Sequence, residues 1–138
     1  MISRNVVVQM MKSGNIFAEH IGNTVQPFGL SLQQFNVLRI LRGRKGIAAS
    51  LESITYDMIH RMSNTSRIVD KLLEKGCVER VICPENRRKV NIFITKKGLR
   101  LLKKIDGIID QKEEKLTASL SKKEMDQLLL LINKIKIK

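Results

Sequence analysis

The sequence predicts a mainly α-helical domain with a small β-hairpin, and three observations support this fold class. Serine or threonine residues precede several apolar stretches of helical period, in the arrangement that begins an α-helix. Two short segments alternate apolar and polar residues, as half-buried strands do. The elements predicted over residues 31–95 follow the order helix, strand, helix, helix, strand, strand, which is the order of a winged helix-turn-helix.

The N-terminal region predicts two helices. Residues 2–21 place apolar side chains at helical spacing, and residues 23–29 predict a turn that contains a proline. Ser31 and Gln34 then form a capping box, in which each side chain bonds the backbone N–H of the other residue. The second helix therefore begins at Ser31, and it ends in the basic cluster 42–46.

The middle of the chain predicts a strand and two further helices. Residues 47–50 are compatible with a short strand, and residues 51–60 with a short helix whose apolar residues face inward. The next helix is capped by Ser63 or Asn64. Gly76 is its expected end, because glycine adopts the left-handed conformation that stops a helix without a steric penalty.

A hairpin and two long helices complete the predicted order. Residues 78–83 and 89–95 are strand-like, and the tip 84–88 between them fits a hairpin connection. A long helix then begins near Lys96 behind a threonine cap. A second capping box within residues 121–124 begins the last helix.

The charge of the chain favours a polyanionic partner. Its 138 residues fit one domain, with a formal net charge of +13 and a pI near 10.2. The excess is concentrated in residues 31–98, which carry 14 basic and 6 acidic residues and a net charge of +8. A generally basic protein without such a partner is the alternative interpretation of the charge.

The sequence also argues against a membrane protein. The longest apolar stretch, residues 128–132, is too short to cross a bilayer. Polar residues interrupt the apolar N-terminal residues where a signal peptide needs a continuous core. We therefore expect a cytoplasmic protein with no membrane partner.

We expect neither a cofactor, a metal site nor an enzyme. Cys77 and Cys83 lie six residues apart on one predicted strand, about 20 Å, which is too far for a direct disulfide. Whether either thiol is redox-active stays open. The two histidines and two cysteines lack zinc-ligand spacing, and we find no nucleophile–base pair and no phosphate-binding glycine loop.

The helix that precedes Gly76 has a polar side suited to the major groove of DNA. Its apolar residues fall on one side of a helical wheel and its polar residues on the other. Recognition helices contact bases mainly with their N-terminal turns, and the backbone N–H groups there attract phosphate. Arg67 is the best candidate for a base contact, bidentate to guanine. The candidate DNA-contacting residues of this helix are Ser63, Asn64, Thr65, Ser66, Arg67 and Lys71.

The predicted hairpin tip carries a second basic group. Arg87, Arg88 and Lys89 follow one another there, and adjacent arginines on a narrow hairpin suit the minor groove, whose negative potential attracts guanidinium groups. A solvated charged loop is the alternative interpretation. A less specific set of phosphate-contact candidates consists of Arg39, Arg42, Arg44 and Lys45.

The small polar residues of the recognition helix also have an alternative interpretation. Serine, threonine and asparagine at a helix start frequently serve only as caps. Arg67 has two alternatives of its own, a phosphate contact without base recognition and a surface ion pair with Asp70.

Several spaced motifs resemble the signature of the MarR family of winged helix-turn-helix transcriptional regulators. That signature has a Thr-Arg-Leu-Val-Asp-x-Leu helix, a wing with Asp-x-Arg, and a Leu-Thr-x-x-Gly entry to the next helix. The matching segments in this chain are 66–72, 75–76, 79–80, 86–88 and 94–98.

The resemblance implies an architecture and a set of partners. Residues 1–138 would form a single domain, in which 31–98 are the DNA-binding module and the helices within 1–26 and 99–138 interlock in a homodimer. The implied function is repression of transcription at a palindromic operator in double-stranded DNA. Many members of the family are released from their operator by a small aromatic effector. The resemblance implies such an effector as a partner here.

Two departures limit what the resemblance transfers. The aspartate of the family's wing is Asn86 here, so the carboxylate that would brace Arg88 is absent. Arg88 stays the candidate for the minor groove, and Arg87 is a second candidate that could share this role. The N-terminal helix holds no cysteine, so the family's cysteine-based oxidant sensing does not transfer.

The residues also leave other functions open. A winged-helix module that binds RNA or a protein partner without operator specificity would show the same motifs. An architectural DNA-binding protein that responds to no effector would also share them, because an apolar crevice and an apolar core have the same sequence pattern.

Overall fold

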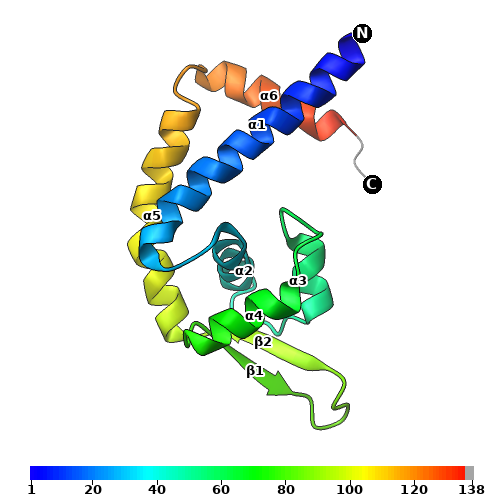
Figure 1. Ribbon diagram of the computed structural model, residues 1–138, viewed down its shortest axis with the longest axis vertical. Coiled ribbons are helices and arrows are strands. Elements are labelled where there is room, and N and C mark those ends of the chain that lie inside the picture. The colour runs from blue at the N-terminus through cyan, green and yellow to red at the C-terminus, as the bar shows by residue number, and fades with distance from the viewer. Residues whose placement is uncertain (136–138) are drawn as a thin grey trace.

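The computed structural model describes residues 1–135 and shows a winged helix-turn-helix with long helical arms (Figure 1). The predicted mainly α-helical fold class with a small β-wing is confirmed. The winged module at one end consists of α2 (Leu32–Gly43), α3 (Leu51–Asp57), α4 (Thr65–Glu74), β1 (Val78–Ile82) and β2 (Val90–Ile94). The remaining elements, which form the arms, are α1 (Ile2–Val25), the 3₁₀ helix η1 (Gln26–Phe28), α5 (Lys96–Leu116) and α6 (Lys122–Lys134).

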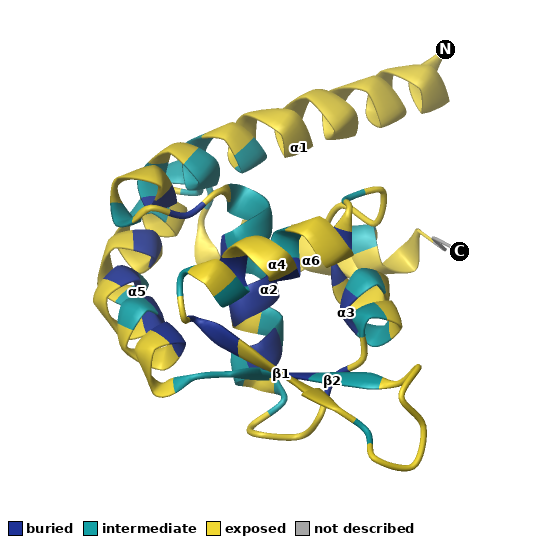
Figure 2. Ribbon diagram, turned by 60° about the horizontal axis from the view of Figure 1, so that its bottom comes forward, coloured by how far each residue is buried: buried dark blue, intermediate teal, exposed yellow. Residues whose placement is uncertain are grey.

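The first helix, α1, is longer than the sequence predicted. A turn was expected from residue 23, but the helix continues to Val25, whose side chain is fully buried in the core. The hydroxyl of Thr24 donates to the carbonyl of His20 one turn earlier, at 2.8 Å. The turn comes afterwards, at η1 and Gly29, whose φ of +78° suits glycine. Residues 1–17 of the chain are all exposed (Figure 2).

The second helix, α2, is the centre of the core. Its predicted capping box is confirmed, with Ser31 Oγ accepting from Gln34 N and Gln34 Oε1 accepting from Ser31 N, each at 3.1 Å. The helix packs against α1, α3, α4, α5 and β2. Because it is enclosed on so many sides, it buries four apolar residues: Phe35, Val37, Leu38 and Leu41.

Two predicted elements of the middle region were wrong in extent. Residues 47–50 form no strand, and only Ala49 pairs with β2, through an isolated bridge to Ile92. The helix predicted to reach residue 60 ends at Asp57. Met58 leaves the helix because its backbone becomes extended and its side chain enters the core, where it is 4% exposed.

The hairpin is confirmed, with strands slightly shorter than predicted. β1 and β2 pair antiparallel, and Arg80 lies opposite Ile92. Cys83 and Lys89 fall outside the strands, but the N–H of Cys83 still donates to the carbonyl of Lys89 at 3.0 Å. This bond closes the base of the tip.

The start of α5 joins the hairpin to the end of α4. Gly76 ends α4 with a φ of +72°, as predicted. Thr95 caps α5 by accepting from Gly98 N at 3.2 Å, and its hydroxyl donates to the carbonyl of Gly76 at 2.7 Å. The backbone N–H of Thr95 donates to the carbonyl of Cys77 at 3.0 Å. Three elements are therefore fixed at one point.

The last helix, α6, begins at the second predicted capping box. Glu124 Oε1 accepts from the backbone N–H of Ser121 at 3.0 Å, and Ser121 Oγ accepts from the backbone N–H of Glu124 at 3.1 Å. The backbone N–H of Ser121, and to a smaller extent its side chain, favour the charged carboxylate and hold the pKa of Glu124 below its ordinary value. None of the residues from Lys122 to Lys134 is buried. Among residues 1–135, we find no helix with the length and apolar character needed to span a bilayer.

We expect Gly98→Ala to destabilise the protein. A Cβ at this position would lie 2.4 Å from the carbonyl oxygen of Cys77 and 2.8 Å from Cγ1 of Ile94. Overpacking of this kind lowers the free energy of unfolding by about 1–3 kcal/mol. Gly107→Ala is the matched control, because it lies on the same helix with nothing within 4 Å of the new Cβ. That variant should gain about 0.5–1 kcal/mol, and equal denaturation midpoints for the two variants would contradict the account.

Candidate nucleic-acid interface

The recognition helix α4 has one buried and one exposed side. Val69 and Leu72 enter the core, whereas the exposed side carries Ser66, Arg67, Asp70, Lys71 and Glu74. Asn64 is the N-cap, and its Oδ1 accepts from the backbone N–H of Arg67 at 3.2 Å. The helical wheel therefore predicted the two sides correctly, and capping is one role that Asn64 performs.

Two of the predicted contact residues do not present their side chains. Thr65 is 5% exposed, and the Oγ of Ser63 is buried with no hydrogen-bond partner within the part of the chain that the structure describes. A DNA contact from Thr65 would have to use its backbone N–H at the helix start, as predicted from the N-terminal position. The side chains of Asn64, Ser66, Arg67 and Lys71 are exposed.

The buried hydroxyl of Thr65 connects α4 to α3. The two hydroxyls of Thr55 and Thr65 lie 2.6 Å apart, and Thr55 Oγ1 also lies 2.8 Å from the carbonyl of Leu51. A hydroxyl has one proton, so Thr55 donates to Leu51 and accepts from Thr65. The two helices of the helix-turn-helix are therefore joined by a short polar bond at the start of α4.

The ion pairs around α4 do not involve Arg67, which is the arginine of this helix. Lys71 lies 3.8 Å from Glu74, and Asp70 lies 3.5 Å from Arg80 of β1. Exposed pairs of this kind contribute little to stability, but the second one connects α4 to the wing. Arg67 makes no ion pair within residues 1–135, so the alternative pair with Asp70 is not formed.

The wing tip is a closed, basic turn. Arg87, Arg88 and Lys89 are exposed. The side chain of Asn86 accepts from the backbone N–H of Arg88 at 3.1 Å, and the carbonyl of Asn86 accepts from Lys89 N at 2.9 Å. Asn86 thus shapes the tip through its amide oxygen, a role that needs no carboxylate.

The less specific phosphate-contact candidates are mostly occupied within the protein. Arg42 pairs with Asp106 of α5 at 2.9 Å, and Arg44 pairs with Asp57 of α3 at 2.6 Å. Arg39 lies over the ring of Phe35, with 5.3 Å between the guanidinium carbon and the ring centre. Arg42 and Arg44 therefore connect helices in this structure.

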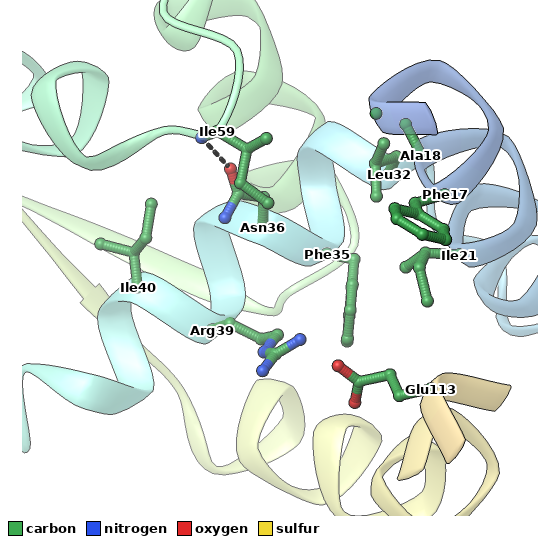
Figure 3. Close-up of a pocket in the computed structure, with 11 residues that line it drawn as sticks. Phe17, Ala18, Ile21, Leu32, Phe35, Asn36, Arg39, Ile40, Ile59 and Glu113 are labelled. Carbon is green, nitrogen blue, oxygen red and sulfur yellow. Dashed lines mark hydrogen bonds between the residues drawn. The ribbon is translucent and has the colours of Figure 1, made fainter. Parts of the chain in front are cut away.

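A cavity of about 580 Å³ lies between α1, α2 and α5, away from the wing (Figure 3). Its walls are mostly apolar, and the polar side chains at it are Asn36, Arg39 and Glu113. Ile59, from the loop between α3 and α4, also lines it. The sequence did not reveal this cavity, because its walls come from segments that are far apart in the chain.

The family comparison agrees with the geometry of the winged module. The model of the MarR family matches residues 30–90, which contain the recognition helix and most of the hairpin. The winged module is therefore similar to a MarR-family domain over residues 30–90. The resemblance of the sequence motifs to this family is confirmed.

Solved structures extend the likeness from the winged module to the arms. A MarR-like transcription regulator from Bacillus cereus has a TM-score of 0.86 and 20% identity, covering 97% of this chain and 95% of its own. A mutant MarR from E. coli in complex with operator DNA has a TM-score of 0.85 and 19% identity, with 96% and 94% covered. BpsR of Bordetella bronchiseptica, whose DNA binding is regulated by 6-hydroxynicotinic acid, has a TM-score of 0.85 and 20% identity, with 95% and 98% covered. At these identities the likeness establishes a shared fold.

We expect Thr55→Val to weaken the winged module by leaving the buried hydroxyl of Thr65 without an acceptor. An unpaired buried hydroxyl lowers the free energy of unfolding by about 1–3 kcal/mol. The double variant Thr55→Val, Thr65→Val also removes the unpaired hydroxyl of Thr65. Its free energy of unfolding, measured by urea denaturation, should recover part of the loss seen in Thr55→Val. A double variant whose loss equals the sum of the two single losses would show that the hydroxyls do not interact.

Proposed function

We propose that the protein is a dimeric transcription regulator that represses its targets by binding a palindromic operator in double-stranded DNA. The observation that supports this most is the exposed basic surface shared by α4 and the wing. Arg67 lies on the exposed side of α4, Arg87 and Arg88 lie on the tip, and the pair between Asp70 and Arg80 connects the two elements. A helix for the major groove and a basic tip for the minor groove can thus engage one duplex together.

The comparisons support the same proposal. The E. coli MarR structure of the same fold is a complex with operator DNA. The concentration of positive charge in residues 31–98 favours the phosphate backbone as a partner, because Lys and Arg side chains release bound counterions when they neutralise phosphates. Base recognition by this chain is assigned to Arg67, with Asn64, Ser66 and Lys71 beside it.

The arms support a homodimer. The first half of α1 is exposed and rich in apolar residues, and α6 exposes Leu128, Leu129, Leu130 and Leu131 at 46–69%. These four consecutive leucines point in directions 100° apart, so α6 exposes apolar side chains around much of its circumference. Exposed apolar surface of this extent usually marks an interaction surface. A second copy of the chain would cover this surface and would present two winged modules to a palindrome.

The cavity supports control by a small aromatic effector. Its volume of about 580 Å³ suits a small molecule, and Phe17 and Phe35 supply aromatic walls. Arg39 offers a cation for an acidic group at the rim. BpsR, which shares the fold, is regulated by an aromatic acid. Occupancy of this cavity is proposed to lower the affinity for the operator.

The DNA-binding proposal predicts a defined result for Arg67. Selection from random duplexes should yield a palindrome whose half-sites are about one helical turn apart, with affinity that falls steeply as salt rises. Arg67→Ala should then lose about 1–3 kcal/mol at one base position, measured by titration of matched and mismatched duplexes.

Arg67→Lys separates base recognition from phosphate attraction. Lysine keeps the charge but lacks the planar fork that bonds guanine twice, so it should lose base preference nearly as fully as alanine. Preserved preference in both the lysine and the alanine variants would assign Arg67 to phosphate. Equal binding of palindromic and scrambled duplexes by the wild type would instead favour the RNA- or protein-binding module. Aromatic acids added to the operator complex test the effector in the same assay.

The dimer proposal predicts that charges on the exposed leucines produce monomers. Leu130 and Leu131 are 69% and 58% exposed within one chain, so Leu130→Glu, Leu131→Glu should leave the monomer fold intact while opposing burial against a partner. Light scattering should report a dimer for the wild type and a monomer for the variant. Lys122→Glu is the control, because it changes the charge in the first turn of α6, about 12 Å along the helix from Leu130, and it should remain dimeric. A monomeric wild type would refute the proposal.

A further inference from the structure

We propose that Asn36 of α2 is a positioning residue that fixes the loop leading into the recognition helix and couples the cavity to DNA binding. The side-chain Oδ1 of Asn36 accepts from the backbone N–H of Ile59 at 2.8 Å (Figure 3). Both residues line the cavity. The inference rests on the proposed DNA-binding function and assigns a regulatory link to it.

The bond between Asn36 and Ile59 fastens a loop that has few other attachments. Residues 59–63 follow the buried Met58 and precede the N-cap of α4. The other hydrogen bonds of this loop are local: Ser63 N donates to the carbonyl of His60, and Arg61 Nε to that of Tyr56. Within residues 1–135, the bond from Asn36 is the one hydrogen bond that joins the loop to an element other than α3.

A displacement of this loop is transmitted to α4. The loop ends at Asn64, which caps α4, and the next residue, Thr65, is bonded to Thr55 of α3 at 2.6 Å. α3, the loop and the start of α4 therefore form a connected unit. Both helices of this unit pack against α2, and the bond from Asn36 joins its loop to α2. The exposed residues assigned to DNA lie in the first turns of α4, next to this attachment.

The opposite end of α4 is held independently of the cavity. Lys75 Nζ donates to the carbonyl of Gly29 and lies 3.0 Å from Oε1 of Gln34. None of these three residues lines the cavity. An occupant of the cavity can therefore reach one end of the recognition helix through Asn36 while Lys75 keeps the other end in place, which tilts the helix instead of detaching it.

The chemistry of the amide explains how occupancy would act. Asn36 has one acceptor oxygen and an NH₂ donor, and it is half-buried in a wall that is otherwise largely apolar. A molecule that fills the cavity displaces the side chain of Asn36 or donates a hydrogen bond to its Oδ1. The backbone N–H of Ile59 then loses its acceptor. An effect on DNA affinity requires only that the operator-binding orientation needs the intact bond.

The first test measures hydrogen exchange of the full chain without DNA or effector. Asn36→Leu keeps the shape of the side chain but removes the acceptor, and it should speed exchange of the Ile59 amide and of loop 59–63 by about two- to tenfold. Asn36→Asp keeps an acceptor oxygen and should exchange like the wild type. Lys75→Met is the control: it should speed exchange near the end of α4 and leave Ile59 unchanged. Unchanged exchange at Ile59 in Asn36→Leu overturns the inference, whether or not the protein binds DNA.

The second test fills the cavity covalently. Gly14 lines the cavity and a Cβ there meets nothing within 4 Å, so Gly14→Trp is designed to fill the cavity. The chain has no tryptophan, so the fluorescence of the new indole reports whether it is buried there. With the selected operator, Gly14→Trp should weaken binding several-fold in the Asn36 background and have no further effect in the Asn36→Leu background. Equal losses in the two backgrounds, or no loss in either, contradict coupling through Asn36. Absence of any operator would refute the proposed function and leave the exchange result standing.

Discussion

Burial of α2 is the constraint on which the rest of the structure depends. Val37 and Leu38 are fully buried, and every other element of the winged module except β1 packs against this helix in addition to α1 and α5. The arms and the winged module are therefore both positioned by contacts with α2. A displacement of the arms on one side of α2 therefore shifts the winged module on the other side, because a close-packed interior transmits displacement instead of absorbing it.

The polar side chains of α2 use this central position. Gln34 caps its own helix and also meets Lys75 at the end of α4, whereas Asn36 holds the loop at the start of α4. One helix thus contacts both ends of the recognition helix through two amides that lie two residues apart in its sequence. Apolar packing places α4 in the core, and these two directional bonds tie its end and the loop before its start to α2.

The elements that the sequence predicted well depend on interactions within one helical turn. The capping boxes at Ser31 and Ser121 and the cap at Thr95 involve partners three residues away. A short segment of sequence therefore includes both residues of each hydrogen bond. The basic wing and the polar side of α4 were also predicted, because charge and helical period are local properties. The early end of α3 was missed, since Met58 leaves the helix to reach a core that forms only in the folded chain.

The features that escaped prediction join residues far apart in the sequence. Thr65 looked like a surface residue at a helix start, and its burial depends on Thr55 in another helix. Asn36 and Lys75 are ordinary polar residues of amphipathic helices until their partners at Ile59 and Gly29 are placed beside them. The candidate interface was thus predictable in its charges, whereas the bonds that orient it were not.

The close approach at Gly98 has a mechanical consequence for the whole molecule. α5 is fixed to the base of the hairpin there, and its 21 residues span about 30 Å from that point to the arms. If α5 rotates as a rigid body about Gly98, a rotation of about 10° moves its far end by about 5 Å. In the proposed dimer, a small reorientation of the winged module would change the separation between the two modules by an amount comparable to the spacing of neighbouring base pairs.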